Sequence, residues 1–326
     1  MTLYRPHARP DARGPRLAGG WLRFEAATVL RRGASPEVVA ADALPPQVLE
    51  RLCAPRAPLA ALDLGAPRLM GIVNVTPDSF SDGGRHLSPE SARARADEMA
   101  AADILDIGGE STRPGATEVP EDEEIARIRP VIEALRDRRI SVDTRKAAVA
   151  RAAIAAGADI VNDVSALTFD AAMAPMLAAT DAPLILMHAQ GAPETMQDDP
   201  RYGDVVHDVY AALEARVAAA EAAGIGRERL VVDPGIGFGK TLEHNLALLR
   251  DIGVFHGLGL PVLLGASRKR FIGTLGGAGV ADARMPGTLA VTLAAVAQGV
   301  QIHRVHDVAE VAQGLALWRA VTEEDR

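Results

Sequence analysis

Three short apolar runs each end on an acid or amide side chain that could hydrogen-bond a ligand. Asp143 closes the run Ile-Ser-Val-Asp, Asn162 closes Ile-Val-Asn, and Asp233 closes Leu-Val-Val-Asp. Each residue alone has a structural explanation, because Asp143 could cap a helix and the other two could organise turns. A carboxylate, however, accepts two parallel hydrogen bonds from a guanidine-like edge. As a set, these side chains indicate a pocket for a flat heterocycle with adjacent N–H donors.

Three cations stand in similar positions. Arg113 follows Gly-Gly-Glu-Ser-Thr, Lys269 follows Ser-Arg, and Arg304 stands two residues before His306. A cation of this kind is most often a solvated surface charge or the partner of a carboxylate. In a chain of net charge −8, three of them after apolar runs indicate a pocket for phosphate or pyrophosphate. Asn74 carries a neutral oxygen that suits Mg²⁺, a metal that keeps several waters and reaches phosphate oxygens.

Two other features resemble functional motifs and are interpreted differently. The stretch Asp-Pro-Gly-Ile-Gly-Phe-Gly-Lys-Thr is not a phosphate loop, because the pattern ending at Lys240 and Thr241 requires glycine where Pro234 stands. We interpret it as a glycine-rich turn that presents Asp233. His188 has no second histidine at metal-binding spacing, which favours a hydrogen-bonded residue of a pocket wall.

Eight repeats of one unit would position these residues. From residue 67 onward a short apolar run, a polar or glycine-rich stretch and a segment with helical spacing follow one another. The apolar runs cover residues 69–75, 104–107, 140–142, 160–162, 184–187, 230–232, 261–264 and 302–305. Strands that are apolar throughout fit a sheet covered on both faces, so the pattern predicts an α/β fold, a closed (β/α)8 TIM barrel, with an open doubly wound sheet as the alternative. In a barrel, polar residues that follow the strands meet at one rim.

Residues 1–66 do not share this rhythm. They contain scattered prolines, an apolar patch at 21–30 and a helical candidate around 47–52, and they are predicted to form an appended segment of unassigned role. The barrel is predicted to span 67–321, followed by a tail at 322–326. Within it, Val205, Val209, Leu213 and Val217 recur every four residues and predict a helix with one apolar stripe.

Composition excludes several classes of protein. The 326 residues include only two Trp, three Tyr and six Phe and carry net negative charge, which argues against a nucleic-acid partner. Cys53 is the single cysteine, so neither an internal disulfide nor a cysteine zinc site is expected, and a reducing compartment fits. The most apolar run, 288–297, is too short to span a membrane. We therefore expect a cytoplasmic protein with no membrane partner.

With these residues in view, the chain resembles the dihydropteroate synthase family of pterin-binding enzymes over 68–321. Two long motifs carry the resemblance: Met-Gly-Ile-Val-Asn-Val-Thr-Pro-Asp-Ser-Phe-Ser-Asp-Gly-Gly at 70–84, and Asp-Ile-Gly-Gly-Glu-Ser-Thr-Arg-Pro-Gly-Ala at 106–116. The segments that contain Asp143, Asn162, His188, Asp233 and Lys269 follow in family order, as does Arg-Val-His-Asp at 304–307. A pterin has the guanidine-like edge that the acids could recognise.

The resemblance implies a TIM barrel that condenses 6-hydroxymethyl-7,8-dihydropterin pyrophosphate with 4-aminobenzoate, giving 7,8-dihydropteroate and pyrophosphate in folate synthesis. It implies a catalytic set made of Asp143, Asp233, Lys269, Arg304 and His306. It implies that the pterin is held by Asp143, Asn162, Asp233 and Lys269, with Met187 and Phe238 against its ring. It assigns the pyrophosphate and its Mg²⁺ to Asn74, Arg113, Arg304 and His306. It assigns 4-aminobenzoate, which sulfonamide drugs mimic, to Phe80, Thr112, Pro114 and Ser267.

The resemblance also implies a homodimer, and it leaves two other functions open. Ala189 and Ile236 stand where a larger Met and Phe are more usual, which concerns pocket packing and none of the polar roles. A corrinoid-linked methyltetrahydrofolate methyltransferase would share a pterin-binding barrel but would have no use for the cations. A noncatalytic pterin carrier would bind dihydropterin without forming product.

Overall fold

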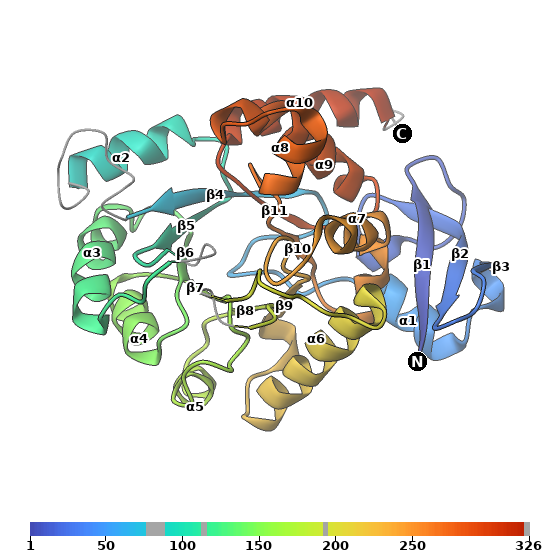
Figure 1. Ribbon diagram of the computed structural model, residues 1–326, viewed down its shortest axis with the longest axis horizontal. Helices are drawn as coiled ribbons and strands as arrows, with labels where there is room; N and C mark the ends of the chain where they lie inside the picture. Colours follow the sequence, from blue (N-terminus) through green and yellow to red (C-terminus); the bar gives the residue numbers. More distant parts are fainter. Residues whose placement is uncertain (76–88, 112–115, 192–194, 323–326) are drawn as a thin grey trace.

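The chain folds into a barrel of parallel strands surrounded by helices, with a small sheet beside it (Figure 1). This computed structural model describes residues 1–75, 89–111, 116–191 and 195–322. Within these residues eight parallel strands form one sheet in the order β10-β11-β4-β5-β6-β7-β8-β9. Their bounds are β4 Arg68–Asn74, β5 Ile104–Gly108, β6 Ile140–Asp143, β7 Ile160–Asp163, β8 Leu184–Met187, β9 Leu230–Asp233, β10 Leu263–Leu264 and β11 Ile302–Val305. Each predicted strand run is confirmed to within two residues at either end.

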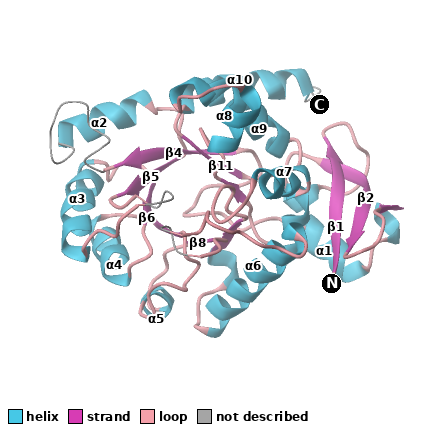
Figure 2. Cartoon of the chain, in the orientation of Figure 1, coloured by secondary structure: helices cyan, strands magenta, loops and turns pink. Residues whose placement is uncertain are grey.

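The two outer strands of this sheet meet, and the meeting decides between the two predicted architectures. Val232 in β9 forms a parallel bridge with Val262, just before β10, and its N–H donates to the carbonyl of Pro261 at 3.0 Å. The sheet therefore closes into the predicted TIM barrel and is not an open doubly wound sheet. Helices lie around its outside (Figure 2). They are α2 Pro89–Glu98, α3 Glu121–Ala134, α4 Ala147–Ala156, α5 Met173–Ala178, α6 Val205–Ala222, α7 Leu242–Arg250, α8 Arg270–Gly276, α9 Met285–Val296 and α10 Val308–Thr322.

Helix α6 illustrates how the sequence determines where an outer helix begins and which face it buries. Asp204 caps its start by accepting hydrogen bonds from the N–H groups of Val206 and His207, which satisfies two of the donors that a helix N-terminus leaves open. The predicted stripe is confirmed, because Val209 and Leu213 are fully buried and Val217 nearly so. No helix in the described part of the chain is both long enough and apolar enough to cross a membrane.

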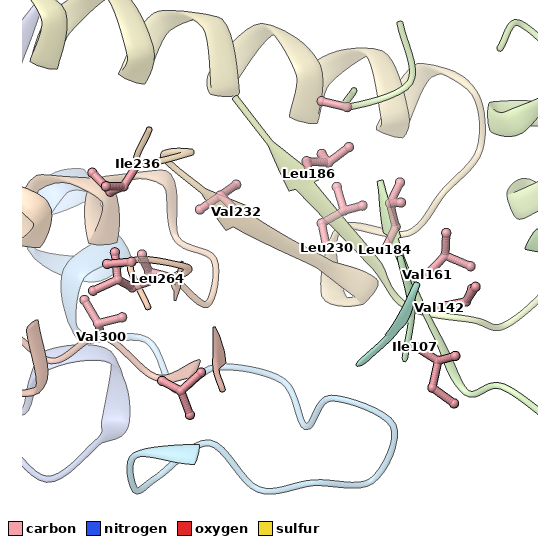
Figure 3. Close-up of a cluster of buried hydrophobic side chains, with 14 of the residues drawn as sticks. Ile107, Val142, Val161, Leu184, Leu186, Leu230, Val232, Ile236, Leu264 and Val300 are labelled. Atoms are coloured by element: carbon pink, nitrogen blue, oxygen red, sulfur yellow. The ribbon is translucent and has the colours of Figure 1, made fainter. Parts of the chain in front are cut away.

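The apolar residues of the barrel strands alternate between two cores. Leu184, Leu186 and Val232 point outward and pack under the helices, as the close-up of buried side chains shows (Figure 3). Ile185 and Val231, one residue along, belong to a separate cluster inside the barrel. Successive side chains of a strand face opposite ways, so one apolar run supplies both cores.

The same alternation places a polar layer above the inner core. The inner core contains residues from most strands near their starting ends, including Ile104, Ile160, Ile185, Val231 and Ile302. Two residues later on the same faces stand Asp106, Asn162, Met187, Asp233 and Arg304. These positions lie toward the carboxyl ends of the strands, which is the rim where barrels of this kind hold their ligands.

Residues 1–66 contain more regular secondary structure than was predicted for the appended segment. They contain an antiparallel sheet in the order β1-β2-β3, with bounds Thr2–Arg9, Arg23–Arg31 and Glu37–Ala40. The predicted helix is confirmed as α1, Pro46–Cys53. Arg5 on β1 pairs with Asp251 at 2.5 Å and Arg32 pairs with Asp208 on α6 at 2.5 Å. The sheet is thus tied to the side of the barrel.

Part of this segment closes the floor of the barrel. Leu59 and Leu62 form an antiparallel bridge, and both belong, with Leu64, to the inner core cluster. Their side chains therefore complete a core whose other members come from the strands. The division at residues 66 and 67 stays a prediction, but these leucines already belong to the packing of the barrel.

Replacing Leu59 with alanine should destabilise the barrel itself. Leu59 is 3% exposed, and truncation of a buried leucine costs about 2–4 kcal/mol of unfolding free energy. Thermal unfolding of the variant should begin well below that of the native chain. Leu275→Ala is the matched control, because Leu275 is 59% exposed and its truncation should change the midpoint little. Equal midpoints for both variants would contradict the assignment of Leu59 to the barrel floor.

Candidate active site

Arg304 joins two acids at the centre of the polar layer. Its Nε donates to Asp106 Oδ2 at 2.5 Å and its Nη2 donates to Asp143 Oδ2 at 2.8 Å. Asn162 Nδ2 donates to the same Asp106 oxygen at 3.3 Å. Four strands, β5, β6, β7 and β11, supply these residues. Side chains that lie up to 198 positions apart in the sequence thus form one hydrogen-bonded network.

Burial decides the electrostatics of this network. Asp143 is 7% exposed, and burial raises its pKa from 3.8 to about 7; Arg304 opposes that rise, whereas the charges of Asp106, Glu124 and Asp163 add to it. The Oδ1 atoms of Asp143 and Asp106 are buried and have no hydrogen-bond partner among the described residues. An unpaired buried acceptor is costly. A ligand that brings N–H donors to Asp143 would remove part of that cost.

Asp233 lies at the end of β9 beside a glycine-rich turn. Its Oδ1 accepts a hydrogen bond from the N–H of Gly235 at 2.7 Å, so the residue organises the turn, as the structural explanation proposed, and also belongs to the site. Burial raises the pKa of Asp233, while Lys269, Lys240 and Arg304 lower it. The influence of Arg304 connects this acid with the network around Asp143.

The turn after β9 is held closely against β8. Gly235 has φ +65°, and a Cβ there would stand 1.9 Å from the carbonyl oxygen of His188, so no other residue type fits. Lys240 Nζ lies 2.9 Å from the carbonyl of Phe238 and 3.0 Å from His188 Nδ1. Burial and Lys269 lower the pKa of Lys240 to about 7, against the pull of Asp233. His188 is therefore hydrogen-bonded, as interpreted from the sequence, and its place in a pocket wall stays a prediction.

Lys269 faces the same turn from the other side. Its Nζ donates to the carbonyl of Ile236 at 2.6 Å and lies 4.0 Å from the centroid of the Phe238 ring. A cation over an aromatic face is attracted by the π electrons. Met187 is in register with Asp233 across β8 and β9. Met187 thus lies beside Asp233 at the end of the neighbouring strand, and Phe238 belongs to the turn that follows Asp233.

Ser267 and His306 form a third part of the rim. Ser267 Oγ lies 3.0 Å from His306 Nδ1 and accepts a hydrogen bond from the His306 backbone N–H at 3.1 Å. Between Ser267 and Lys269, Arg268 adopts a left-handed φ of 56°. Its Nε donates to Asp307 at 2.9 Å. The role of Arg268 is therefore structural. Its neighbours Ser267 and Lys269 are the residues predicted to contact substrate.

The described residues bring ten of the predicted site residues to one rim. These ten are Asn74, Asp143, Asn162, Met187, Asp233, Phe238, Ser267, Lys269, Arg304 and His306. The other four, Phe80, Thr112, Arg113 and Pro114, lie outside the described residues. The helix-cap explanation of Asp143 is wrong, because α4 begins at Ala147 and its N-cap residue is Lys146.

Sequence reasoning missed two residues of the site. Asp106 is fully buried in the network, although we had noted it only as the first residue of a motif. Its signal was a carboxylate inside an otherwise apolar strand, two residues after an inward-facing isoleucine. Lys240 was considered only as part of a phosphate loop, and no signal in its spacing indicated the contact with His188.

Fold and site together define an enzyme of the (β/α)8 class whose chemistry lies at the carboxyl ends of its strands. The profile of the family described as "Pterin binding enzyme" matches residues 70–306. The dihydropteroate synthase of Escherichia coli strain K12 is 47% identical over 265 residues, which cover 80% of this chain and 93% of that protein. The chain belongs to the pterin-binding enzyme family, and within it to the dihydropteroate synthases.

Solved structures agree in fold. A Yersinia pestis dihydropteroate synthase in a sulfonamide drug complex is 44% identical with a TM-score of 0.77, and it covers 81% of this chain and 97% of its own. A Xanthomonas albilineans dihydropteroate synthase in complex with 7,8-dihydropteroate is 44% identical with a TM-score of 0.74, covering 83% and 100%. The predicted resemblance to the family is therefore confirmed.

Proposed function

We propose that this protein condenses 6-hydroxymethyl-7,8-dihydropterin pyrophosphate with 4-aminobenzoate to give 7,8-dihydropteroate and pyrophosphate. The activity is that of the dihydropteroate synthases, a transferase reaction of folate synthesis. One observation supports it most directly: Asp143, Asn162 and Asp233, buried at 4–7% exposure, stand on one rim together with Arg304. The residue roles described below are our proposals.

Asp143, Asn162 and Asp233 would hold the pterin by its N–H donors. Both acids are buried. Arg304 pairs with Asp143, and Asp143 has an oxygen without a partner among the described residues. A fork of two N–H donors matches the two oxygens of a carboxylate. Lys269 and the ring of Phe238, 4.0 Å apart, would lie against the heterocycle with Met187.

Arg304, His306 and Arg113 would hold the pyrophosphate. A bound Mg²⁺ would neutralise charge on the leaving diphosphate. The described residues contain no group of three or more His, Cys, Asp or Glu that could hold a metal ion. Asn74 ends β4 in register with Gly108, and Gly108 lies against the side chain of Asp143. One amide oxygen at the rim fits a Mg²⁺ that is held mainly by waters and substrate phosphates.

The chemistry we propose begins with departure of pyrophosphate. The C–O bond to the pterin methylene breaks and its electron pair leaves with the pyrophosphate, whose charge Arg304 and His306 would stabilise. Positive charge then spreads over the dihydropterin, where Asp143 and Asp233 would stabilise it. The neutral amine of 4-aminobenzoate attacks the methylene and afterwards loses a proton. A strong general base is not required, because a neutral aniline nitrogen is already nucleophilic.

This assignment predicts a pH dependence. The carboxylate form of Asp143 accepts hydrogen bonds from N–H donors. Burial raises its pKa to about 7; Arg304 opposes this rise, whereas Asp106, Glu124 and Asp163 add to it. Because kcat/KM follows ionisation in the free enzyme, kcat/KM for the pterin substrate should fall as the pH drops below about 7. Rates measured from pH 5 to 8.5 test this. A profile that stays flat down to pH 5 would contradict the role of Asp143.

The remaining features of the proposal concern 4-aminobenzoate and assembly. Phe80, Thr112, Pro114 and Ser267 would form the 4-aminobenzoate site, and Ser267 is held by His306 at 3.0 Å. A homodimer is supported by α9, which carries no charged residue, and by Leu317 and Val321 on α10, which are 63% and 84% exposed. A cytoplasmic location is supported by the lone Cys53.

An assay with the pterin pyrophosphate, radiolabelled 4-aminobenzoate and Mg²⁺ tests the function. We expect labelled dihydropteroate and one pyrophosphate for each product molecule. Tight binding of dihydropterin with no labelled product would favour a pterin carrier. Methyl transfer from methyltetrahydrofolate, with no product from 4-aminobenzoate, would favour the corrinoid-linked methyltransferase.

A further inference from the structure

We infer that Asp106 is a positioning residue of the reaction, which acts by fixing the guanidinium of Arg304. The inference rests on the proposed function, because it assigns Arg304 to the substrate. Asp106 stands in the middle of β5, two residues after Ile104 of the inner core. It is completely buried, so it lies below the surface that a substrate would touch.

Two donors converge on one oxygen of Asp106. Arg304 Nε lies 2.5 Å from Asp106 Oδ2, and Asn162 Nδ2 lies 3.3 Å from the same atom. Asp106 therefore connects a cation on β11 with an amide on β7. Both are residues that we assign to substrate, and neither neighbours β5 in the sheet order.

The contacts of Arg304 show how Asp106 fixes the orientation of its guanidinium. Nε and Nη2 lie on one edge of the guanidinium, and that edge is shared between Asp106 and Asp143. Nη1 has no hydrogen bond with any residue that the structure describes, and the Arg304 side chain is 20% exposed. Two fixed points on a planar group define its orientation. Asp106 and Asp143 together therefore leave Nη1 directed away from the acids.

Asp143 alone would not give the same result. It would bind Arg304 through Nη2 only, and a guanidinium held at one nitrogen can turn about that contact. Asp143 also has to meet the substrate in our proposal, whereas Asp106 is completely buried and does not. Of the two donors on Asp106, Arg304 is the nearer, at 2.5 Å against 3.3 Å for Asn162. We therefore assign the main effect of Asp106 on the reaction to Arg304.

A double-mutant cycle tests this route of action. Asp106→Asn keeps the size of the side chain and removes its charge, and Arg304→Met removes the group through which Asp106 acts. In the native background we expect Asp106→Asn to lower kcat/KM for the pterin pyrophosphate about 100-fold, as loss of a buried charged hydrogen bond does. In the Arg304→Met background it should change kcat/KM by less than about threefold. Equal losses in the two backgrounds would overturn the inference.

Ser141→Ala is the matched control. Ser141 is in register with Asp106 on the neighbouring strand β6, and its buried hydroxyl has no partner among the described residues. The substitution should leave kcat/KM within about twofold, since it removes a polar atom that binds nothing. A loss like that of Asp106→Asn would mean that any change at this depth disturbs the site, and would overturn the inference.

Two further comparisons keep the test decisive. If Asp106→Asn unfolds at the assay temperature, Asp106→Glu replaces it in the cycle, because the longer side chain keeps the charge and displaces Arg304. It should again reduce activity only where Arg304 is present. Absence of dihydropteroate with the native chain and with Ser141→Ala would contradict the proposed function itself. An active native chain with an unaffected Asp106→Asn variant would contradict only the role of Asp106.

Discussion

Replacing Arg304 with methionine is expected to lower kcat/KM for the pterin pyrophosphate by about three orders of magnitude. Arg304 pairs with Asp106 and Asp143, whose side chains are 0% and 8% exposed. In our proposal the leaving pyrophosphate loses a cation, and removal of one group that stabilises developing charge lowers the rate about 100- to 1,000-fold. The two acids also lose their common partner, so we expect the upper end of this range. Steady-state kinetics with each substrate varied in turn measures the effect.

The same variant should change the pH profile in a defined direction. Arg304 lowers the pKa of Asp143, so its loss should raise that pKa further and move the acidic limb of kcat/KM to higher pH. Arg93→Met is the matched control. Arg93 pairs with Asp137 at 2.7 Å, but both side chains are exposed, and such a pair contributes at most about 1 kcal/mol. Similar losses for the two variants would contradict the special role of Arg304, which is paired with two buried acids.

Replacing Asp233 with asparagine should weaken pterin binding by about 10- to 150-fold. The carboxylate is buried at 5% exposure, and a hydrogen bond to a charged group contributes about 1.5–3 kcal/mol. Asparagine keeps one acceptor but turns a donor toward the N–H groups of the ligand, which leaves polar atoms unpaired. Isothermal calorimetry with a dihydropterin gives Kd directly, and kinetics gives KM for the pyrophosphate.

Asp159→Asn provides the comparison for this acid. Asp159 accepts a hydrogen bond from the N–H of Ile140 at 2.8 Å, at the start of β6 and therefore at the opposite end of the barrel from Asp233. Its replacement should leave Kd unchanged. The assignment of Asp233 to the pterin would be contradicted by a native Kd in Asp233→Asn, or by equal losses in both variants.

The barrel could be predicted because its signal is local and repeated. Each strand is a short apolar run followed by a polar residue, and the strand of 184–187 was placed without error. A closed barrel follows from the number of units and from their length. The polar residues after the runs then had to meet at one rim, so Asp143, Asn162, Asp233 and Arg304 could be grouped before any coordinates.

The contacts within the site could not be predicted in the same way. The sequence indicates that Arg304 stands at the rim, but the choice of Asp106 and Asp143 as its partners depends on how the strands are staggered. The sheet of residues 1–66 was missed because its strands are separated by prolines and turns. The role of Leu59 in the barrel floor was missed because a pair of leucines in an irregular segment has no periodicity.

The central claim is that one ring of side chains at the rim holds the pterin. A crystal structure of the native chain with bound 7,8-dihydropteroate tests it most directly. We predict the pterin ring between Met187 and Phe238, with Asp143, Asn162 and Asp233 within hydrogen-bond distance of its nitrogen atoms. A ligand bound elsewhere on the chain, or a pterin at the rim that touches none of these three side chains, would contradict the account.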